Sequence, residues 1–128
     1  MILVVDDDPA SVEALSELLK HAGHDVVCAE NGRQALERLR AGERVCVILL
    51  DVMMPVMNGY EFREEQMKDP TLASIPVFLL TADWRARKRA EELHTEGFFQ
   101  KPVSPPELLA AVGEYCRPSP PLARDLRP

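Results

Sequence analysis

The chain has 128 residues, of which 46% are hydrophobic and 28% are charged, a composition typical of a single globular domain. The formal net charge of −6 argues against binding to nucleic-acid phosphates, which requires a positive surface. No hydrophobic run approaches the roughly 20 residues of a membrane-spanning helix, and the first run lacks the basic segment of a signal peptide. We therefore expect a cytoplasmic protein that binds neither nucleic acid nor membrane.

The three cysteines are Cys28, Cys46 and Cys116. Their number is odd and no two are spaced as C-x-x-C, so the spacing does not indicate a metal site. Cys28 and Cys46 fall within hydrophobic stretches typical of strands. The sequence therefore predicts three reduced cysteines that fill core positions in a reducing compartment, without a disulfide.

Short hydrophobic runs alternate with segments of helical periodicity along the chain. The hydrophobic runs predict five strands, at residues 2–5, 25–28, 45–51, 75–81 and 97–100. The periodic segments predict five helices, at about residues 9–22, 32–41, 60–68, 84–96 and 105–115. Runs rich in valine, isoleucine and leucine, such as the third, are typical of strands buried on both faces.

Several residues beside these helices are typical helix-end signals. Asp8 is an N-cap candidate followed by Pro9 at the first helical position, and Asn31 is expected to cap the second helix. Residues 104–107, with the sequence Ser-Pro-Pro-Glu, predict a capping box at the last helix. Gly23 is a candidate for the C-terminal cap of the first helix.

The alternation predicts an α/β fold, in which a doubly wound, five-stranded parallel sheet carries five helices on its two faces. The expected strand order is the flavodoxin-like order 2-1-3-4-5. The first and third strands are then neighbours. Their carboxyl ends lie where the strand order reverses, which is where ligands bind in sheets of this kind.

Acidic residues stand at the carboxyl ends of these two strands. Asp6 and Asp7 follow the first strand, and Asp51 ends the third. Three carboxylates at one point repel each other unless a cation neutralises them. Mg²⁺ suits such a site because it is typically held by one or two carboxylates together with waters and phosphate oxygens. Taken separately, acidic residues before a helix are often only capping residues.

Two further polar residues are expected at the same edge of the sheet. Thr81 ends the fourth strand, and Lys101 follows the fifth. Alone, the first is typical of a strand-end turn and the second of a solvated loop. Together with the carboxylates they suit phosphoryl transfer, in which a carboxylate attacks phosphorus while cations neutralise charge.

Four motifs occur in a fixed order and spacing: Val4–Asp7, Leu50–Pro55 with Gly59, Pro76–Ala82 and Phe99–Pro102. With these motifs the chain resembles the receiver domain of two-component response regulators. The resemblance covers residues 1–116, which we expect to form one receiver domain. Residues 117–128 are rich in proline and are expected to be a flexible tail or a linker stub.

The resemblance implies a phosphoacceptor and a metal site. Asp51 would accept the phosphoryl group. Asp7, Asp51 and the backbone carbonyl of Met53 would bind Mg²⁺ directly (Mn²⁺ is an alternative), and Asp6 would act mainly through a bound water. Met53 and Asp83 occupy positions at which the family varies and that are thought to tune the lifetime of the phosphoryl group.

The resemblance also implies a phosphoryl-stabilising pair and a switch. Lys101 would pair with Asp51 and then with the phosphoryl group, and Thr81 would donate a hydrogen bond to it. Thr81 and Phe98 would be the switch residues, with the fourth helix as the element that moves. The bond between Lys101 and Pro102 would be cis.

The function that the resemblance implies is a phosphorylation-dependent signalling switch. The partners would be a histidine kinase or phosphotransfer protein and an unknown output domain or protein, and the only catalysis would be of its own phosphorylation and dephosphorylation. Two alternatives stay open: a binding module of the same fold that acts without phosphorylation, and a small Mg²⁺-dependent phosphatase. The acidic pair and arginine with which one large subfamily dimerises are missing, so the sequence indicates no oligomeric state.

Overall fold

The computed structural model describes residues 1–118. Within these residues, five strands and five helices alternate: β1 (Ile2–Val5), α1 (Pro9–His21), β2 (Val26–Ala29), α2 (Gly32–Arg40), β3 (Val47–Asp51), α3 (Gly59–Lys68), β4 (Val77–Thr81), α4 (Ala86–Glu92), β5 (Gly97–Gln100) and α5 (Pro105–Gly113). All strand pairs are parallel, in the order β2-β1-β3-β4-β5, which confirms the predicted fold. The predicted tail at residues 117–128 lies, beyond Pro118, outside the described residues.

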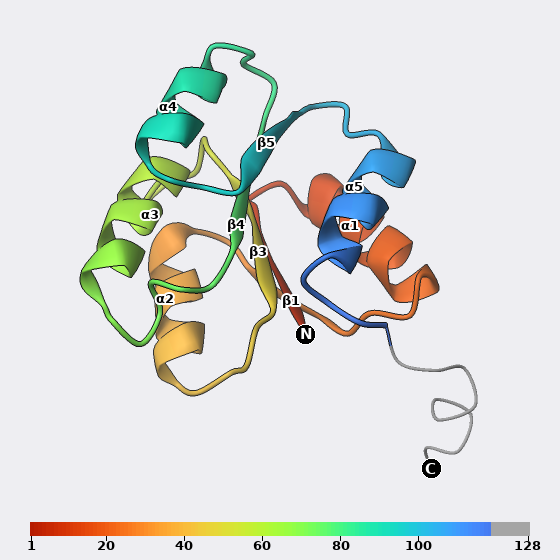
Figure 1. The fold of residues 1–128 in the computed structure, drawn as a ribbon, viewed down its shortest axis with the longest axis horizontal. Coiled ribbons are helices and arrows are strands. Elements are labelled where there is room, and N and C mark those ends of the chain that lie inside the picture. Colours follow the sequence, from red (N-terminus) through yellow and green to blue (C-terminus); the bar gives the residue numbers. More distant parts are fainter. Residues whose placement is uncertain (119–128) are drawn as a thin grey trace.

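The sheet forms the middle layer of three. Helices α1 and α5 cover one face, and α2, α3 and α4 cover the other (Figure 1). Successive side chains of a strand point to opposite faces, so Leu3 and Val5 join the core beneath α2–α4 while Ile2 and Val4 join the core beneath α1 and α5. This explains why the central strands are hydrophobic throughout. None of the described helices is long and apolar enough to cross a membrane.

The helix-end predictions hold for α1 and α2 and fail at α5. Asp8 accepts a hydrogen bond from the backbone N–H of Ala10 (3.2 Å), and Asn31 accepts one from Gln34 (2.8 Å). The capping box predicted at residues 104–107 is wrong, because the Ser104 side chain forms no capping hydrogen bond. The two prolines that follow it carry no N–H group, so the first turn has fewer donors to satisfy.

The fourth helix is shorter than predicted at both ends. Residues 84–85 form a turn instead, because the Asp83 carboxylate accepts hydrogen bonds from the backbone N–H and the side chain of Arg85 (both 3.0 Å). At the other end His94 has a φ of 54°, a left-handed conformation that ends the helix. Only Ala86 and Ala90 of α4 are buried, so the buried face of this helix consists of two methyl groups.

A buried arginine holds the end of α4 against α3. Arg63 is 3% exposed and donates to the backbone carbonyls of Leu93 (3.0 Å) and His94 (2.7 Å). Its third hydrogen bond goes to Gln66 (2.8 Å), which itself donates to the carbonyl of Leu72. Because buried polar groups must be hydrogen-bonded, this network fixes the carboxyl end of α4. The amino end of the same helix has no side-chain cap.

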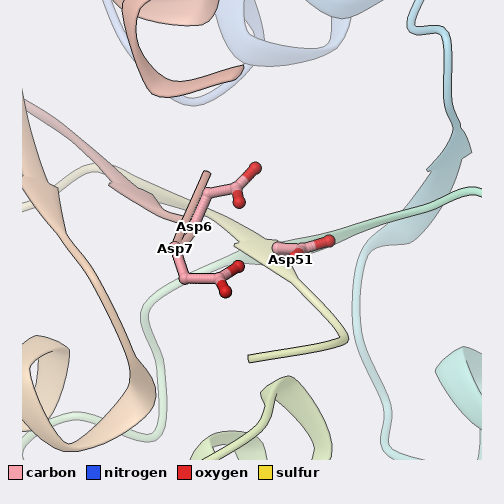
Figure 2. Close-up of side chains that lie close together, drawn as sticks. All are labelled: Asp6, Asp7 and Asp51. Atoms are coloured by element: carbon pink, nitrogen blue, oxygen red, sulfur yellow. The ribbon is translucent and has the colours of Figure 1, made fainter. Parts of the chain in front are cut away.

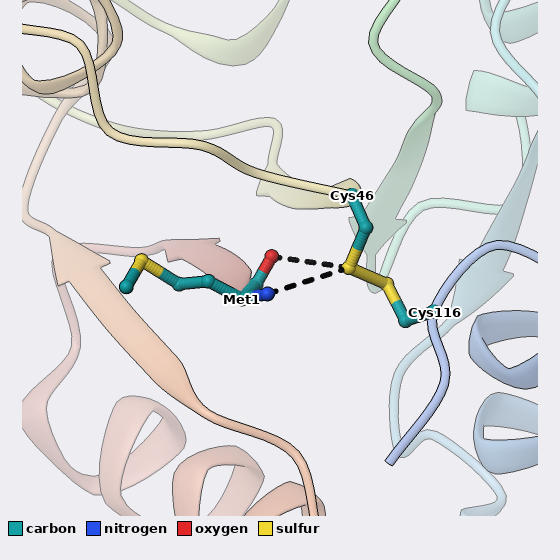
Figure 3. Close-up of a disulfide and its surroundings, with 3 residues drawn as sticks. All are labelled: Met1, Cys46 and Cys116. Atoms are coloured by element: carbon teal, nitrogen blue, oxygen red, sulfur yellow. Dashed lines mark hydrogen bonds between the residues drawn. A yellow bond between two sulfur atoms is a disulfide. The ribbon is translucent and has the colours of Figure 1, made fainter. Parts of the chain in front are cut away.

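The prediction that all cysteines are reduced is wrong. Cys46 and Cys116 form a disulfide with a Cα–Cα distance of 5.6 Å, and only Cys28 is free (Figure 3). The two residues are 70 positions apart in the sequence. Sequence spacing cannot reveal such a pair, because the fold alone brings the end of α5 to the start of β3.

Gly59 is required by a close approach of two backbone segments. Its N–H donates to the carbonyl of Val52 (2.9 Å), which brings the start of α3 against the end of β3. A Cβ atom at this position would lie 2.5 Å from the backbone oxygen of Asp51. The absence of a side chain at position 59 therefore fixes the loop that follows Asp51.

We expect Gly59→Ala to lower the free energy of unfolding by about 2 kcal/mol, because β3 and α3 must separate to admit the methyl group. Gly113→Ala is the matched control, since a Cβ atom there meets nothing within 4 Å. The control is expected to stabilise the protein by up to about 1 kcal/mol, because alanine favours a helix over glycine. Urea denaturation measures both, and equal effects of the two substitutions would contradict this view of Gly59.

Candidate functional site

Three carboxylates meet at the carboxyl ends of β1 and β3. These strands are neighbours with Val5 paired to Leu50, so Asp6 and Asp7 emerge beside Asp51 (Figure 2). One oxygen of each carboxylate lies within 4.8 Å of the others. Asp6 and Asp51 are buried, whereas Asp7 is exposed. The cluster that the strand order predicts is therefore present at the edge of the sheet.

Lys101 provides the positive charge that touches this cluster. Its Nζ lies 3.1 Å from Oδ2 of Asp6 and 3.3 Å from Oδ1 of Asp51. The backbone explains this reach: the N–H of Lys101 donates to the carbonyl of Thr81 (2.7 Å), which holds the residue at the end of β5 next to β4. The following bond to Pro102 is cis.

Burial and mutual repulsion affect the protonation of the site. Burial, with the nearby charge of Asp6, raises the pKa of Asp51, and the opposing attraction of Lys101 only partly offsets this. For Lys101, burial acts to lower the pKa, but the hydrogen bond to Asp6 and the charge of Asp51 outweigh it and the net shift is upward. The ammonium is therefore held charged, while Asp51 remains a destabilised carboxylate with a high affinity for positive charge.

The donor set fits a hard divalent cation. Lys101 contacts Asp6 and Asp51, and the exposed Asp7 carboxylate forms no hydrogen bond or ion pair within residues 1–118. Three carboxylates with one ammonium leave an excess of negative charge, and all the ligands are oxygens, which Mg²⁺ prefers. Met53 lies two residues after Asp51 in the loop held by Gly59, with its side chain 76% exposed.

Thr81 lies at the end of β4, one strand from Asp51. It is buried, and its Oγ1 accepts a hydrogen bond from the N–H of Asp83 (3.1 Å). The hydroxyl hydrogen is then available for another acceptor. Asp83 itself is held by Arg85, which keeps its charge in the turn after β4.

Phe98 lies on β5, next to α4. Its ring is half-buried and packs against the core beneath α2–α4, and the guanidinium of Arg87 lies 5.7 Å from the ring centroid. Arg87 belongs to α4, so this cation–π contact joins the helix to the ring. The contact of Arg87 and the Arg63 network could not be predicted from the sequence, because a charged residue on a helix carries no signal of its partner.

The direction of the Asp51 pKa shift gives a testable dependence of stability on pH. A raised pKa means that the folded protein takes up this proton more readily than the unfolded chain. The free energy of unfolding therefore falls as the pH rises from the ordinary aspartate range through the raised pKa of Asp51. In metal-free buffer we expect Asp51→Asn to be more stable than the wild type at neutral pH by on the order of 1 kcal/mol, and the difference to shrink in acid.

Denaturant titrations at several pH values measure this difference. Asp69→Asn is a control of opposite sign, because hydrogen bonds from Thr71 lower the pKa of Asp69. Its contribution to stability is present at neutral pH and is lost as the pH falls through that lowered pKa. An Asp51→Asn variant that is less stable than the wild type at neutral pH would contradict the prediction.

Comparisons with known proteins agree on one family. Residues 2–113 match the model of the response regulator receiver domain. The transcriptional regulatory protein CrdR of Helicobacter pylori is 36% identical over 121 residues, which cover 93% of this chain and 56% of CrdR. The chain spans about half the length of the first curated relatives that it matches.

Solved structures give the same result. The receiver domain of a signal transduction histidine kinase from Syntrophus aciditrophicus superposes with a TM-score of 0.80 at 34% identity, over 89% of this chain and 87% of that one. The receiver domain of the sensor histidine kinase PA1611 from Pseudomonas aeruginosa has a TM-score of 0.80 at 26% identity, over 89% and 94% of the two chains. That structure contains a magnesium ion coordinated in its active site cleft.

Proposed function

Because the chain belongs to the receiver domain family of response regulators, we propose that it is a phosphorylation-dependent signalling switch with Asp51 as the phosphoacceptor. The observation that carries the proposal is the convergence of Asp51, the carboxylates of Asp6 and Asp7, and the ammonium of Lys101 at one edge of the sheet. The phosphodonor is a histidine kinase or a phosphotransfer protein.

The proposed reaction is a single displacement at phosphorus. An oxygen of Asp51 attacks the phosphorus of a phosphohistidine, the P–N bond breaks, and the imidazole leaves with the electron pair. Lys101 already contacts Asp51 and would pair with the incoming phosphoryl oxygens. Thr81 would donate its free hydroxyl hydrogen to one of these oxygens. Water later hydrolyses the aspartyl phosphate and restores the carboxylate.

We assign the metal to Asp7, Asp51 and the backbone carbonyl of Met53, with Asp6 acting mainly through a water. When bound, Mg²⁺ (or Mn²⁺) would neutralise charge on the transferring phosphoryl group. Two observations support this assignment: the oxygen-only donor set with its excess negative charge, and the magnesium ion in the related PA1611 receiver. The roles of the individual ligands rest on the resemblance of the motifs.

The switch is proposed to act through Thr81, Phe98 and α4. Drawing Thr81 toward a phosphoryl oxygen would break its hydrogen bond with Asp83, at the turn that leads into α4. Arg63 fixes the far end of the helix, whereas its amino end is uncapped and its buried face consists of two alanines. We therefore expect the amino end of α4 to move, with Phe98 repacking beneath it.

The wider setting is also a proposal. Residues 1–116 would form the receiver and residues 117–128 a tail or linker stub, in a cytoplasmic protein whose output domain or partner is unknown. Since the first curated relatives are about twice as long, the output could lie in another part of the same protein. The domain would catalyse only its own phosphorylation and dephosphorylation. The alternative is a binding module of this fold that acts without phosphorylation.

Incubation with acetyl phosphate and Mg²⁺, followed by intact mass measurement, tests the proposal. We expect one phosphoryl adduct, which is lost in Asp51→Asn and on chelation of the metal. Asp69→Asn is the matched control and should keep the adduct, because Asp69 lies at the end of α3 and outside the carboxylate cluster. The absence of an adduct with acetyl phosphate or a phosphohistidine donor would favour the binding module. Rapid turnover of an unrelated phosphate ester would favour a phosphatase.

The exposed side chain of Met53 leads to a prediction about the lifetime of the phosphoryl group. We expect Met53→Asn to be phosphorylated normally and to lose its phosphoryl group severalfold faster, because an amide can orient a water molecule through hydrogen bonds that a thioether forms only weakly. The decay of the adduct after removal of the donor measures the rate. Met67→Asn is the control, because Met67 is also exposed but lies on α3. Its phosphoryl adduct should decay at the wild-type rate. An unchanged rate in Met53→Asn would contradict the prediction.

A further inference from the structure

The Cys46–Cys116 disulfide lies at the amino-terminal end of β3, and the carboxylates lie at the carboxyl end of the same strand. Cys46 precedes the first residue of β3, whereas Asp51 is the last residue of the same strand. Cys116 follows α5 and is the last buried residue of the described part of the chain. The bond therefore joins the end of α5 to the central sheet, away from the proposed phosphorylation chemistry.

We propose that Cys46 and Cys116 are a reversible redox site, a covalent clasp that closes and opens by thiol–disulfide exchange with a low-molecular-weight disulfide such as glutathione disulfide. In the closed state the end of α5 is fixed to the start of β3. In the open state the turn after Val112 is held only by non-covalent contacts.

These non-covalent contacts allow the fold to exist in both states. Val112 is fully buried, and its carbonyl accepts hydrogen bonds from the N–H groups of Tyr115 (3.0 Å) and Cys116 (2.9 Å). The Tyr115 ring packs on Phe78 at 5.9 Å, and its hydroxyl donates to Glu96 (3.2 Å). A domain of this size with a core on each face of its sheet does not need a disulfide to fold. The link is therefore an addition to an already packed helix end.

The surroundings of Cys46 suit a reduced thiol as well as a disulfide. Its Sγ lies 3.1 Å from the backbone carbonyl oxygen of Met1, an acceptor to which a thiol could donate (Figure 3). A disulfide sulfur carries no hydrogen, so this contact is a hydrogen bond only in the reduced state. Reduction of the disulfide therefore leaves the Cys46 thiol with a hydrogen-bond acceptor.

The difference in exposure between the two cysteines determines which of them reacts first with the small disulfide. Cys46 is partly exposed, whereas Cys116 is 3% exposed. The Cys46 thiolate attacks one sulfur of the small disulfide, expels one thiolate and forms a mixed disulfide. The Cys116 thiolate then attacks the Cys46 sulfur and expels the second. The two protein thiols are oxidised, the small disulfide is reduced to two thiols, and these take up the two protons.

In a reducing compartment such as the cytoplasm proposed above, a disulfide is typically transient or redox-sensing. Cys28 offers a contrast within the same chain. It lies on β2, its Sγ is 3.5 Å from the hydroxyl of Ser16, and it is the free cysteine of the described residues. It therefore serves as an internal reference for thiol chemistry that does not involve the clasp.

The full chain, equilibrated in buffers that range from excess reduced glutathione to excess glutathione disulfide, tests the proposal. After quenching, alkylation under denaturing conditions counts the free thiols by mass. We expect one adduct, on Cys28, in oxidising buffer and three in reducing buffer, with full return when the buffer is exchanged. Three adducts in every buffer, or one in every buffer, would overturn the proposal, because the pair would then be permanently open or permanently closed.

Hydrogen exchange tests whether the disulfide stabilises the end of α5 locally. We expect the amides of Tyr115 and Cys116 to exchange about 10-fold faster in the reduced protein. The unfolding temperature should fall by on the order of 10 °C with the fold retained. Cys46→Ser should behave as the reduced protein in every buffer, and Cys28→Ser as the wild type. Equal exchange at these amides in both states, or unfolding of the reduced protein at room temperature, would overturn the proposal.

Discussion

The contact of Lys101 with two buried carboxylates is the interaction on which the site depends. Asp6 and Asp51 lie side by side because β1 and β3 are neighbours, and their repulsion would be costly without a nearby cation. The ammonium neutralises only part of this charge. The remaining excess destabilises the charged form of Asp51 and would favour a bound divalent ion, as the proposed function requires. The domain therefore gives up some stability at the residue that the proposed function uses.

The parts of the molecule around this site differ in how firmly they are held. β3 is fully buried, and the loop after it is fixed by the close approach of Gly59. The fourth helix is anchored at one end by Arg63 and packs through two alanines. A firmly held Asp51, together with a helix anchored at one end, is the arrangement that the proposed switch needs for a local chemical change to reach a distant surface. The disulfide is not part of this arrangement, because it lies at the other end of β3.

The sequence predicted the strand order and the residues that gather at the edge. Hydrophobic runs that end in Asp6, Asp51 and Thr81 are a local signal, and alternation with helices determines which strand ends are adjacent. Two of its failures have a local cause. The start of α4 depends on a turn held by Asp83, and the start of α5 lacks the predicted cap where two prolines remove donors. The third, the missed disulfide, joins cysteines that are 70 positions apart.

The sequence by itself determined the fold and the chemical groups of the site, because side-chain hydrophobicity and strand-end position are properties that a residue carries wherever it lies. Only the tertiary structure determined which side chains contact each other. Cys46 meets Cys116, Arg63 binds the carbonyls at the end of α4, and Arg87 covers Phe98. Each of these contacts joins residues distant in sequence or without periodic relation, and their partners are set by how the layers pack.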